Sequence, residues 1–151
     1  MDRLNLPTYS FSVKSEAGKK YIFDPVRKRY VLLSPEEWVR QNFIQYLVRE
    51  RSFPVSLIGV EQEFELNRMK KRSDIMVYGK SGFPVMLVEC KSPAVKISRH
   101  VFQQIGLYHL KHRLPWLVVT NGLQHFCCKR DDNTGRYRFE KEIPLWSDLL
   151  H

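Results

Sequence analysis

The chain has 151 residues, of which 43% are hydrophobic, so it is long enough for one ordinary core and too short for two large ones. Lysine and arginine number 25 against 16 aspartates and glutamates, and the net charge of +9 favours a polyanionic partner. No apolar run approaches the roughly 18 residues of a membrane span, and the N-terminus lacks a signal-peptide pattern, so we expect a soluble cytoplasmic protein with no membrane partner.

Residues 1–33 predict an N-terminal β-meander, with strands over 9–13, 21–23 and 29–33 separated by turn-forming residues. Ser34 and Pro35 then begin a helix that we expect to run to about residue 51. Serine suits the N-cap, proline suits the first helical position, and Glu37 lies three residues after the cap, as in a capping box.

The remaining segments predict a mixed sheet. Strands are expected over 57–66, 74–78 and 85–90, linked as hairpins, with a basic loop over 67–72. A helix is expected over 98–112, and a hairpin over 116–129 with a type I′ turn at Asn121-Gly122. A strand over 137–139 and a short helix over 145–150 follow. We therefore predict a single α/β domain over 1–151: a β extension (1–33), a core (34–129) and a C-terminal hairpin strand and helix (130–151).

Three charged residues interrupt the apolar strands of this core. Because side chains alternate across a strand, Glu89 and Lys91 share one face, whereas Cys90 points the other way, among Leu87 and the core. Asp74 opens the preceding strand, and a tight turn over 79–82 would place it beside the end of the next strand. We therefore expect Asp74, Glu89 and Lys91 to converge at one end of the sheet.

Two carboxylates with a backbone carbonyl form a hard-oxygen site that suits Mg²⁺ or Mn²⁺. A metal there would activate water and neutralise charge on a phosphodiester, and Lys91 would orient that water or stabilise the transition state. The residues alone leave an alternative open, because Lys91 paired with Glu89 or Asp74 would equally form a partly buried ion pair without chemistry.

The chain resembles the PD-(D/E)XK nuclease superfamily, with Asp74 and Glu89-Cys90-Lys91 in the places of the signature. More narrowly, the segments 35–41, 72–74, 88–93, 104–108 and 119–122 occur in the order typical of the N-terminal nuclease domain of type I restriction enzyme R (HsdR) subunits. This resemblance covers about residues 20–125.

The resemblance implies a restriction-endonuclease-like fold, a mixed central sheet flanked by helices, and Mg²⁺- or Mn²⁺-dependent DNA cleavage. It implies Asp74 and Glu89 as metal ligands with the Cys90 carbonyl, and Lys91 as the catalytic lysine. Gln104 and Tyr108 match the Q-x-x-x-Y element of such nucleases, although without the family they are a surface residue and a core aromatic. The resemblance implies DNA as a partner, with restriction-system subunits as possible protein partners. Because the sequence has no helicase or phosphate-loop motif, a separate motor protein is a further expected partner.

Other charged residues carry open alternatives. Glu37 is either an acidic site residue from the first helix or only the capping-box partner of Ser34. The basic residues around the loop either contact DNA phosphates or are solvated; they are Arg68, Lys70, Lys71, Arg72 and, farther along, Lys96. Glu61, Glu63 and Glu65 are expected on a solvated strand face.

The cysteines predict neither disulfides nor zinc. Cys90, Cys127 and Cys128 are an odd number without framework spacing and are expected as reduced thiols. With His109 and His112 they lack a convincing zinc-ligand pattern. The sequence thus favours a metal-dependent deoxyribonuclease domain, and the alternative is an inactive nuclease fold that binds DNA or serves as an adaptor.

Overall fold

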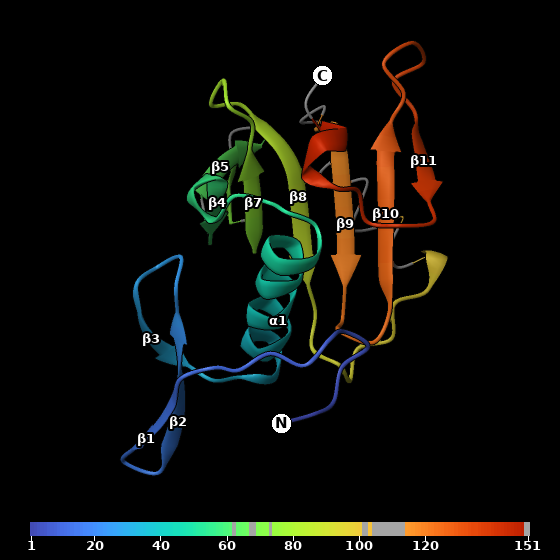
Figure 1. The fold of residues 1–151 in the computed structure, drawn as a ribbon. Helices are drawn as coiled ribbons and strands as arrows, with labels where there is room; N and C mark the ends of the chain where they lie inside the picture. The colour runs from blue at the N-terminus through green and yellow to red at the C-terminus, as the bar shows by residue number, and fades with distance from the viewer. Residues whose placement is uncertain (62, 67–68, 73, 101–102, 104–113, 150–151) are drawn as a thin grey trace.

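The structure, a computed structural model, describes residues 1–61, 63–66, 69–72, 74–100, 103 and 114–149, and only the backbone of 63–66 and 69–72. Its centre is a six-stranded mixed sheet in the order β11-β10-β9-β8-β7-β4 (Figure 1). The strands are β4 (Ile58–Val60), β7 (Ile75–Tyr78), β8 (Pro84–Cys90), β9 (Trp116–Thr120), β10 (His125–Arg130) and β11 (Tyr137–Glu140). Only the β8–β9 pair is parallel among these strands. The predicted mixed α/β architecture is confirmed.

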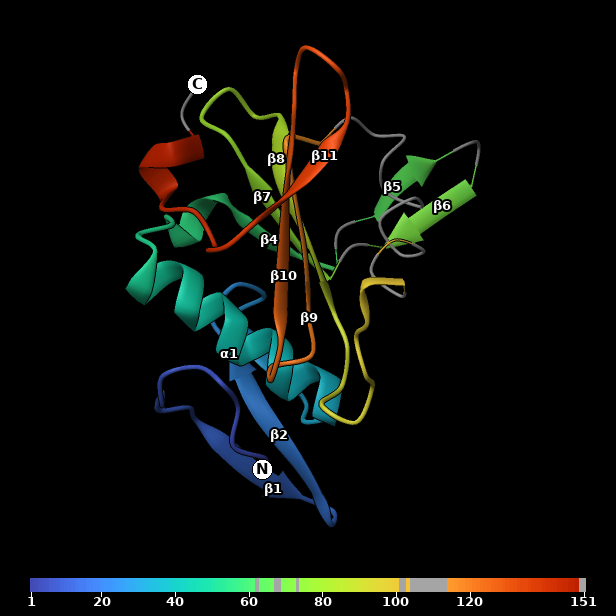
Figure 2. The same ribbon diagram turned by 90° about the vertical axis from the view of Figure 1, so that its right-hand side faces the viewer.

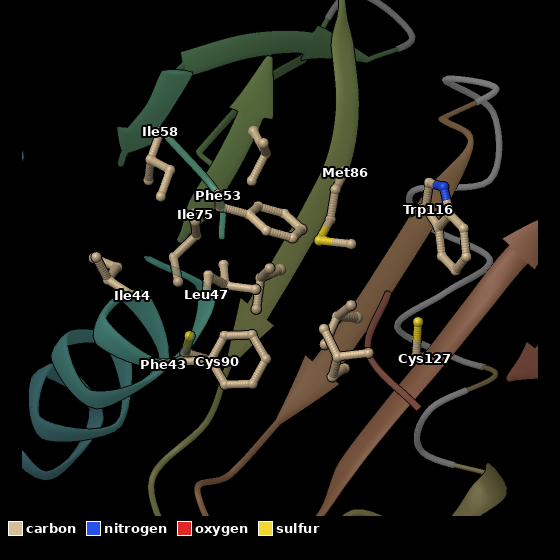
Figure 3. Close-up of a cluster of buried hydrophobic side chains, with 14 of the residues drawn as sticks. Phe43, Ile44, Leu47, Phe53, Ile58, Ile75, Met86, Cys90, Trp116 and Cys127 are labelled. Carbon is tan, nitrogen blue, oxygen red and sulfur yellow. The ribbon is translucent and has the colours of Figure 1, made fainter. Parts of the chain in front are cut away.

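Helix α1 (Pro35–Glu50) packs on one face of this sheet, as the capping signal predicts. The Ser34 hydroxyl accepts a hydrogen bond from the Glu37 N–H at 3.0 Å, which satisfies one of the free amides of the first turn. Phe43, Ile44 and Leu47 of the helix meet Ile75, Met86 and other side chains of the sheet in the larger core (Figure 3). The site described below lies at the end of the sheet beside the first turn of α1.

A second, smaller core covers the opposite face of the sheet. It contains Met76, Leu87, Leu117 and Val119, with Ile97 from the segment that follows β8. Cys90 belongs to the larger core and Leu87 to the smaller one. The expectation that the Cys90 side chain lies on the same face of the sheet as Leu87 is therefore wrong. Strand alternation explains the difference, since residues 87 and 89 share one face whereas 88 and 90 share the other.

The N-terminal meander is a separate three-stranded antiparallel sheet: β1 (Val13–Glu16), β2 (Lys19–Asp24) and β3 (Arg29–Leu32). The first strand lies later than the predicted 9–13. Ala17 and Gly18 form a two-residue turn with φ values of 51° and 78°, which pairs Glu16 with Lys19 and continues the strand to the turn. This sheet lies beside the first turn of α1 (Figure 2).

The strand predicted over 57–66 is instead broken in two. A 3₁₀ turn, η1 (Val55–Leu57), leads to β4, after which Glu61 takes φ +52° and redirects the chain. Strand β5 (Glu63–Leu66) then pairs with β6 (Met69–Arg72) in a two-stranded sheet of its own. The prediction of a basic loop is therefore wrong for Met69–Arg72.

The β9–β10 turn also differs from the prediction. A type I′ turn needs positive φ at both central residues, but only Gly122 has it, at 86°. Asn121 instead accepts hydrogen bonds from the Leu123 and Gln124 N–H groups on its side-chain oxygen. The predicted C-terminal helix is a 3₁₀ turn, η2 (Trp146–Leu149), and Trp146 contacts Phe53 with ring centroids 5.5 Å apart.

Most of the helix predicted over 98–112 lies outside the described residues. Within this range, Arg99, His100 and Gln103 are helical. Within the described part of the chain, no helix combines the length and apolar character that a membrane crossing requires.

Candidate active site

Asp74, Glu89 and Lys91 lie together where β7 begins and β8 ends, and Arg40 of α1 contacts Asp74 there. Ile75 pairs with Val88 in the antiparallel register, so Asp74 comes beside Glu89 and Cys90. The Lys91 N–H donates to the Thr120 carbonyl at 2.8 Å, which ties the residue after β8 to the adjacent parallel strand.

The Asp74 carboxylate is held by two donors. Its Oδ2 accepts from the Cys90 N–H at 2.7 Å, and its Oδ1 accepts from Nη2 of Arg40 at 2.9 Å. Burial, followed by the neighbouring Glu89 charge, raises the pKa of Asp74 from 3.8 to about 6. The Arg40 and Cys90 donors counteract only part of this rise, so the site contains a carboxyl whose ionised form is disfavoured.

Glu89 and Lys91 form an ion pair on the same face, with 3.4 Å between Lys91 Nζ and Glu89 Oε1. Their side chains are 18% and 34% exposed, so both reach solvent. The pair is thus positioned at the surface end of a buried strand, where an ammonium group has access to a molecule that approaches from solvent. Burial raises the pKa of the Cys90 thiol well above its ordinary value, so this thiol stays protonated.

The first helix contributes Glu37 and Arg40 to the same end of the sheet. Glu37 Oε1 accepts from Arg40 Nη1 at 2.6 Å, and Oε2 accepts from the Gln41 side chain at 3.0 Å. Burial lowers the pKa of Arg40, but the negative charges of Glu37 and Asp74 outweigh this effect and the pKa is raised overall. The guanidinium therefore stays charged. Glu37 therefore contacts Arg40 and Gln41 through its side chain, in addition to its backbone role in the helix cap.

Sequence reasoning missed Arg40, Arg27 and Asp24. Arg40 lies three residues after Glu37, so helical spacing was the signal for it. Arg27 comes from the β2–β3 turn and donates to Glu37 at 2.7 Å and to Glu61 at 3.2 Å, contacts that no sequence pattern predicts. The expectation that Glu61 is solvated is wrong, because its carboxylate also lies 3.5 Å from Arg40.

A cleft of about 570 Å³ opens beside these residues. Besides Arg27, Glu37, Arg40 and Glu61, it is lined by Val31, Leu32, Ser34, Pro35, Glu36 and Ser92. This cleft exposes Arg27, Glu37, Arg40 and Glu61 to solvent, whereas Asp74, Glu89 and Lys91 are not part of its lining.

Several other predicted site residues are not placed in this cluster. Gln104, Tyr108 and Arg68 lie outside the described residues, as do His109 and His112. Lys70, Lys71 and Arg72 belong to β6, for which only the backbone is described, and Lys96 is exposed. Cys90, Cys127 and Cys128 are free thiols, as predicted, and all three are buried.

The donor set at the strand end suits a hard divalent cation. In the described part of the chain, no group of three or more acidic, histidine or cysteine side chains is arranged to hold a metal. Asp74 and Glu89 are nevertheless two carboxylates that repel each other, since Glu89 raises the pKa of Asp74. Mg²⁺ commonly uses one or two protein carboxylates and keeps several waters, so these two residues fit such an ion.

Comparisons with known proteins identify the family and the fold. Residues 35–144 match the model of the family "Type I restriction enzyme R protein N terminus (HSDR_N)". A solved fragment described as an HsdR subunit of a type I restriction enzyme from Vibrio vulnificus YJ016 superposes with a TM-score of 0.53 at 19% identity. The similarity covers 78% of this chain and 24% of that one. A search of curated protein sequences finds no match.

The structural likeness supports the fold, and the family match covers the helix, both strands of the charged site and the β9–β11 sheet. The chain spans about a quarter of the length of the HsdR chain to which it is similar. This chain belongs to the family of type I restriction enzyme R protein N-terminal domains.

Proposed function

We propose that this domain hydrolyses DNA phosphodiester bonds with the help of Mg²⁺ or Mn²⁺. The observation that carries the proposal is the convergence of Asp74, Glu89 and Lys91 at one accessible strand end in a chain of this family. Two adjacent carboxylates and an ammonium group are the side chains that metal-assisted hydrolysis of a phosphodiester requires.

Asp74 and Glu89, with the Cys90 carbonyl, would hold the metal, which when bound activates water and neutralises phosphate charge. Lys91 donates a hydrogen bond to the attacking water or to a phosphate oxygen, where charge develops in the transition state. Its 34% exposed side chain reaches solvent while its backbone is fixed by Thr120. Gln104 and Tyr108 are proposed to complete the site.

The basic residues supply DNA affinity in this proposal. Strand β6 ends two residues before Asp74, so a cation-rich segment leads directly into the site. Lys96 is exposed in the segment after Lys91. Contacts from Arg68, Lys70, Lys71, Arg72 and Lys96 to phosphates would release counterions and make binding fall with salt concentration. Other restriction-system subunits, or a separate motor protein, are the proposed protein partners.

The test is plasmid cleavage in Mg²⁺ and in Mn²⁺ by the wild type, Asp74→Ala and Lys91→Ala. Lys80→Ala is the matched control, because Lys80 is an exposed lysine in the turn between β7 and β8. We expect cleavage by the wild type and the control, and a loss of about 100-fold or more in the other two variants. Equal cleavage by the wild type and Lys91→Ala would exclude the proposed role of Lys91.

One observation favours a second candidate function. Both Asp74 oxygens already have donors and Lys91 is paired with Glu89, so the same geometry also describes a self-satisfied ion-pair cluster. A catalytically inactive module that binds DNA or serves as an adaptor would need no more than this. Salt-sensitive DNA binding without turnover in either metal, unchanged in Lys91→Ala, would support that function.

A further inference from the structure

Arg27 is a largely buried cation in the turn between β2 and β3, outside the residues 35–144 that match the family. Its side chain is 13% exposed and contacts three carboxylates: Asp24, Glu37 and Glu61. A guanidinium that is this buried is retained only where its donors are satisfied, because an unpaired buried charge is strongly unfavourable. The contacts of Arg27 therefore fix how the N-terminal sheet meets the rest of the domain.

Asp24 holds Arg27 in a defined geometry. Its Oδ1 accepts from the Val26 N–H at 2.8 Å and from the Arg27 N–H at 3.2 Å, which shapes the turn after β2. Its Oδ2 accepts from the Arg27 Nε. Asp24 is completely buried. The turn is therefore built to direct the two terminal nitrogens of Arg27 toward the core domain.

Two routes connect Arg27 with Asp74. In the first, Glu37 Oε1 accepts from both Arg27 and Arg40, at 2.7 Å and 2.6 Å, and Arg40 Nη2 then donates to Asp74. In the second, Arg27 donates to the Glu61 carboxylate at 3.2 Å, and the Glu61 N–H donates to the Asp74 carbonyl at 3.2 Å. Both the side chain and the backbone of Asp74 are thus connected to the N-terminal sheet.

The orientation of Arg40 depends on this arrangement. Its buried Nε has no hydrogen-bond partner among the described residues, so the guanidinium is oriented by its two terminal nitrogens. One of these donates to Glu37 and the other to Asp74. If Arg27 is removed, Glu37 Oε1 keeps Arg40 as its one donor among these contacts, while Oε2 still accepts from Gln41, so the forces that hold Arg40 against Asp74 change.

We infer that Arg27 is a positioning residue that acts through Glu37, Arg40 and Glu61 to orient the Asp74 carboxylate. The N-terminal sheet is in this view part of the site and not an appendage to it. The consequence for catalysis rests on the proposed function, whereas the consequence for the geometry of Asp74 does not. Residues that orient a metal ligand typically change metal affinity or activity by about 10- to 100-fold when they are replaced.

The test uses Arg27→Gln, Arg27→Lys and the matched control Arg29→Gln, which removes the same charge from an exposed position two residues later. The readout is the Cys90 amide in ¹⁵N NMR of the metal-free protein, because this N–H donates to Asp74 Oδ2. We expect a changed chemical shift and faster hydrogen exchange in Arg27→Gln, a smaller change in Arg27→Lys, which keeps one cationic donor, and none in Arg29→Gln.

Activity is measured on the same proteins. We expect kcat for DNA cleavage to fall about 10- to 100-fold in Arg27→Gln with KM for DNA unchanged, since Arg27 acts on Asp74 and not on the substrate. If Arg27→Gln does not fold, Arg27→Lys against Arg29→Gln decides the question. A Cys90 amide that changes no more in the Arg27 variants than in Arg29→Gln overturns the inference. Absence of cleavage by the wild type instead refutes the proposed function and leaves the NMR comparison intact.

Discussion

Replacement of Asp74 by asparagine should stabilise the metal-free fold at neutral pH. The pKa of Asp74 is raised from 3.8 to about 6 by burial and by Glu89. Because the folded pKa lies above the unfolded value, the native state binds more protons between these values, and stability falls as pH rises through about 6. At 1.36 kcal/mol per pKa unit, the ionised carboxylate opposes folding by about 3 kcal/mol at pH 7.5.

Asparagine removes the charge, but it also loses one of the two hydrogen bonds that the Asp74 carboxylate accepts. Asp74 accepts from Arg40 and from the Cys90 N–H on different oxygens, so the amide nitrogen of asparagine must face one of these donors. The loss of one hydrogen bond costs about 1 kcal/mol of stability. The free energy of unfolding of Asp74→Asn should therefore exceed that of the wild type by about 2 kcal/mol at pH 7.5. At pH 4 the native carboxyl is already protonated, and the gain should disappear.

The assay is guanidinium unfolding in EDTA at pH 7.5 and pH 4. Asp132→Asn is the control, because its side chain is 95% exposed and its charge should have little effect on stability. A variant Asp74→Asn that is no more stable than the wild type at pH 7.5 would refute the reasoning. So would an equal gain at both pH values, since that gain would not come from the ionised carboxylate.

Three further predictions concern single side chains. Glu89→Gln should lower the pKa of Asp74 below about 6 but leave it above 3.8, because burial is a larger cause of the rise than Glu89. A ¹³C NMR titration of the Asp74 carboxyl measures this pKa, and an unchanged value would contradict the prediction. Gly122→Ala should destabilise by about 1–3 kcal/mol more than Gly18→Ala in chemical unfolding. Both glycines have positive φ, but only at Gly122 would a Cβ meet a side chain, at 2.7 Å from Leu4; equal losses contradict this. Burial raises the pKa of Cys128 to about 11, and all three free thiols are buried. A thiol reagent should therefore modify the cysteines far faster in guanidinium than in the native protein. Equal rates would contradict the burial of the thiols.

The strand end of the site was predictable because it depends on local rules. Alternation places Glu89 and Lys91 on one face, and the short turn between β7 and β8 brings Asp74 to the same end of the sheet. The helix cap at Ser34 was predictable for the same reason, since the serine, the proline and Glu37 lie within four residues. These features need no knowledge of the rest of the fold.

Other features depend on contacts between distant segments. Arg27 and Glu61 are 34 residues apart and meet only after the N-terminal sheet packs beside α1. The break between β4 and β5 depends on the single positive φ of Glu61, a residue type that no turn rule favours there. A periodic pattern therefore predicts one continuous strand, whereas the chain turns at the residue whose carboxylate then reaches Arg27 and Arg40.

Among the side chains that the structure describes, charge at the site is distributed differently from charge in the whole chain. Asp24, Glu37, Glu61, Asp74 and Glu89 surround Arg27, Arg40 and Lys91, so these described groups carry more negative than positive charge, while the chain as a whole is +9. A basic surface attracts a polyanion, and a locally negative strand end attracts a cation. Burial and Glu89 raise the pKa of Asp74, so in the proposed function a divalent cation would relieve the repulsion between Asp74 and Glu89. In the proposed function, the same carboxylate repulsion that opposes folding at this end of the sheet would favour a metal ion that faces a phosphate backbone.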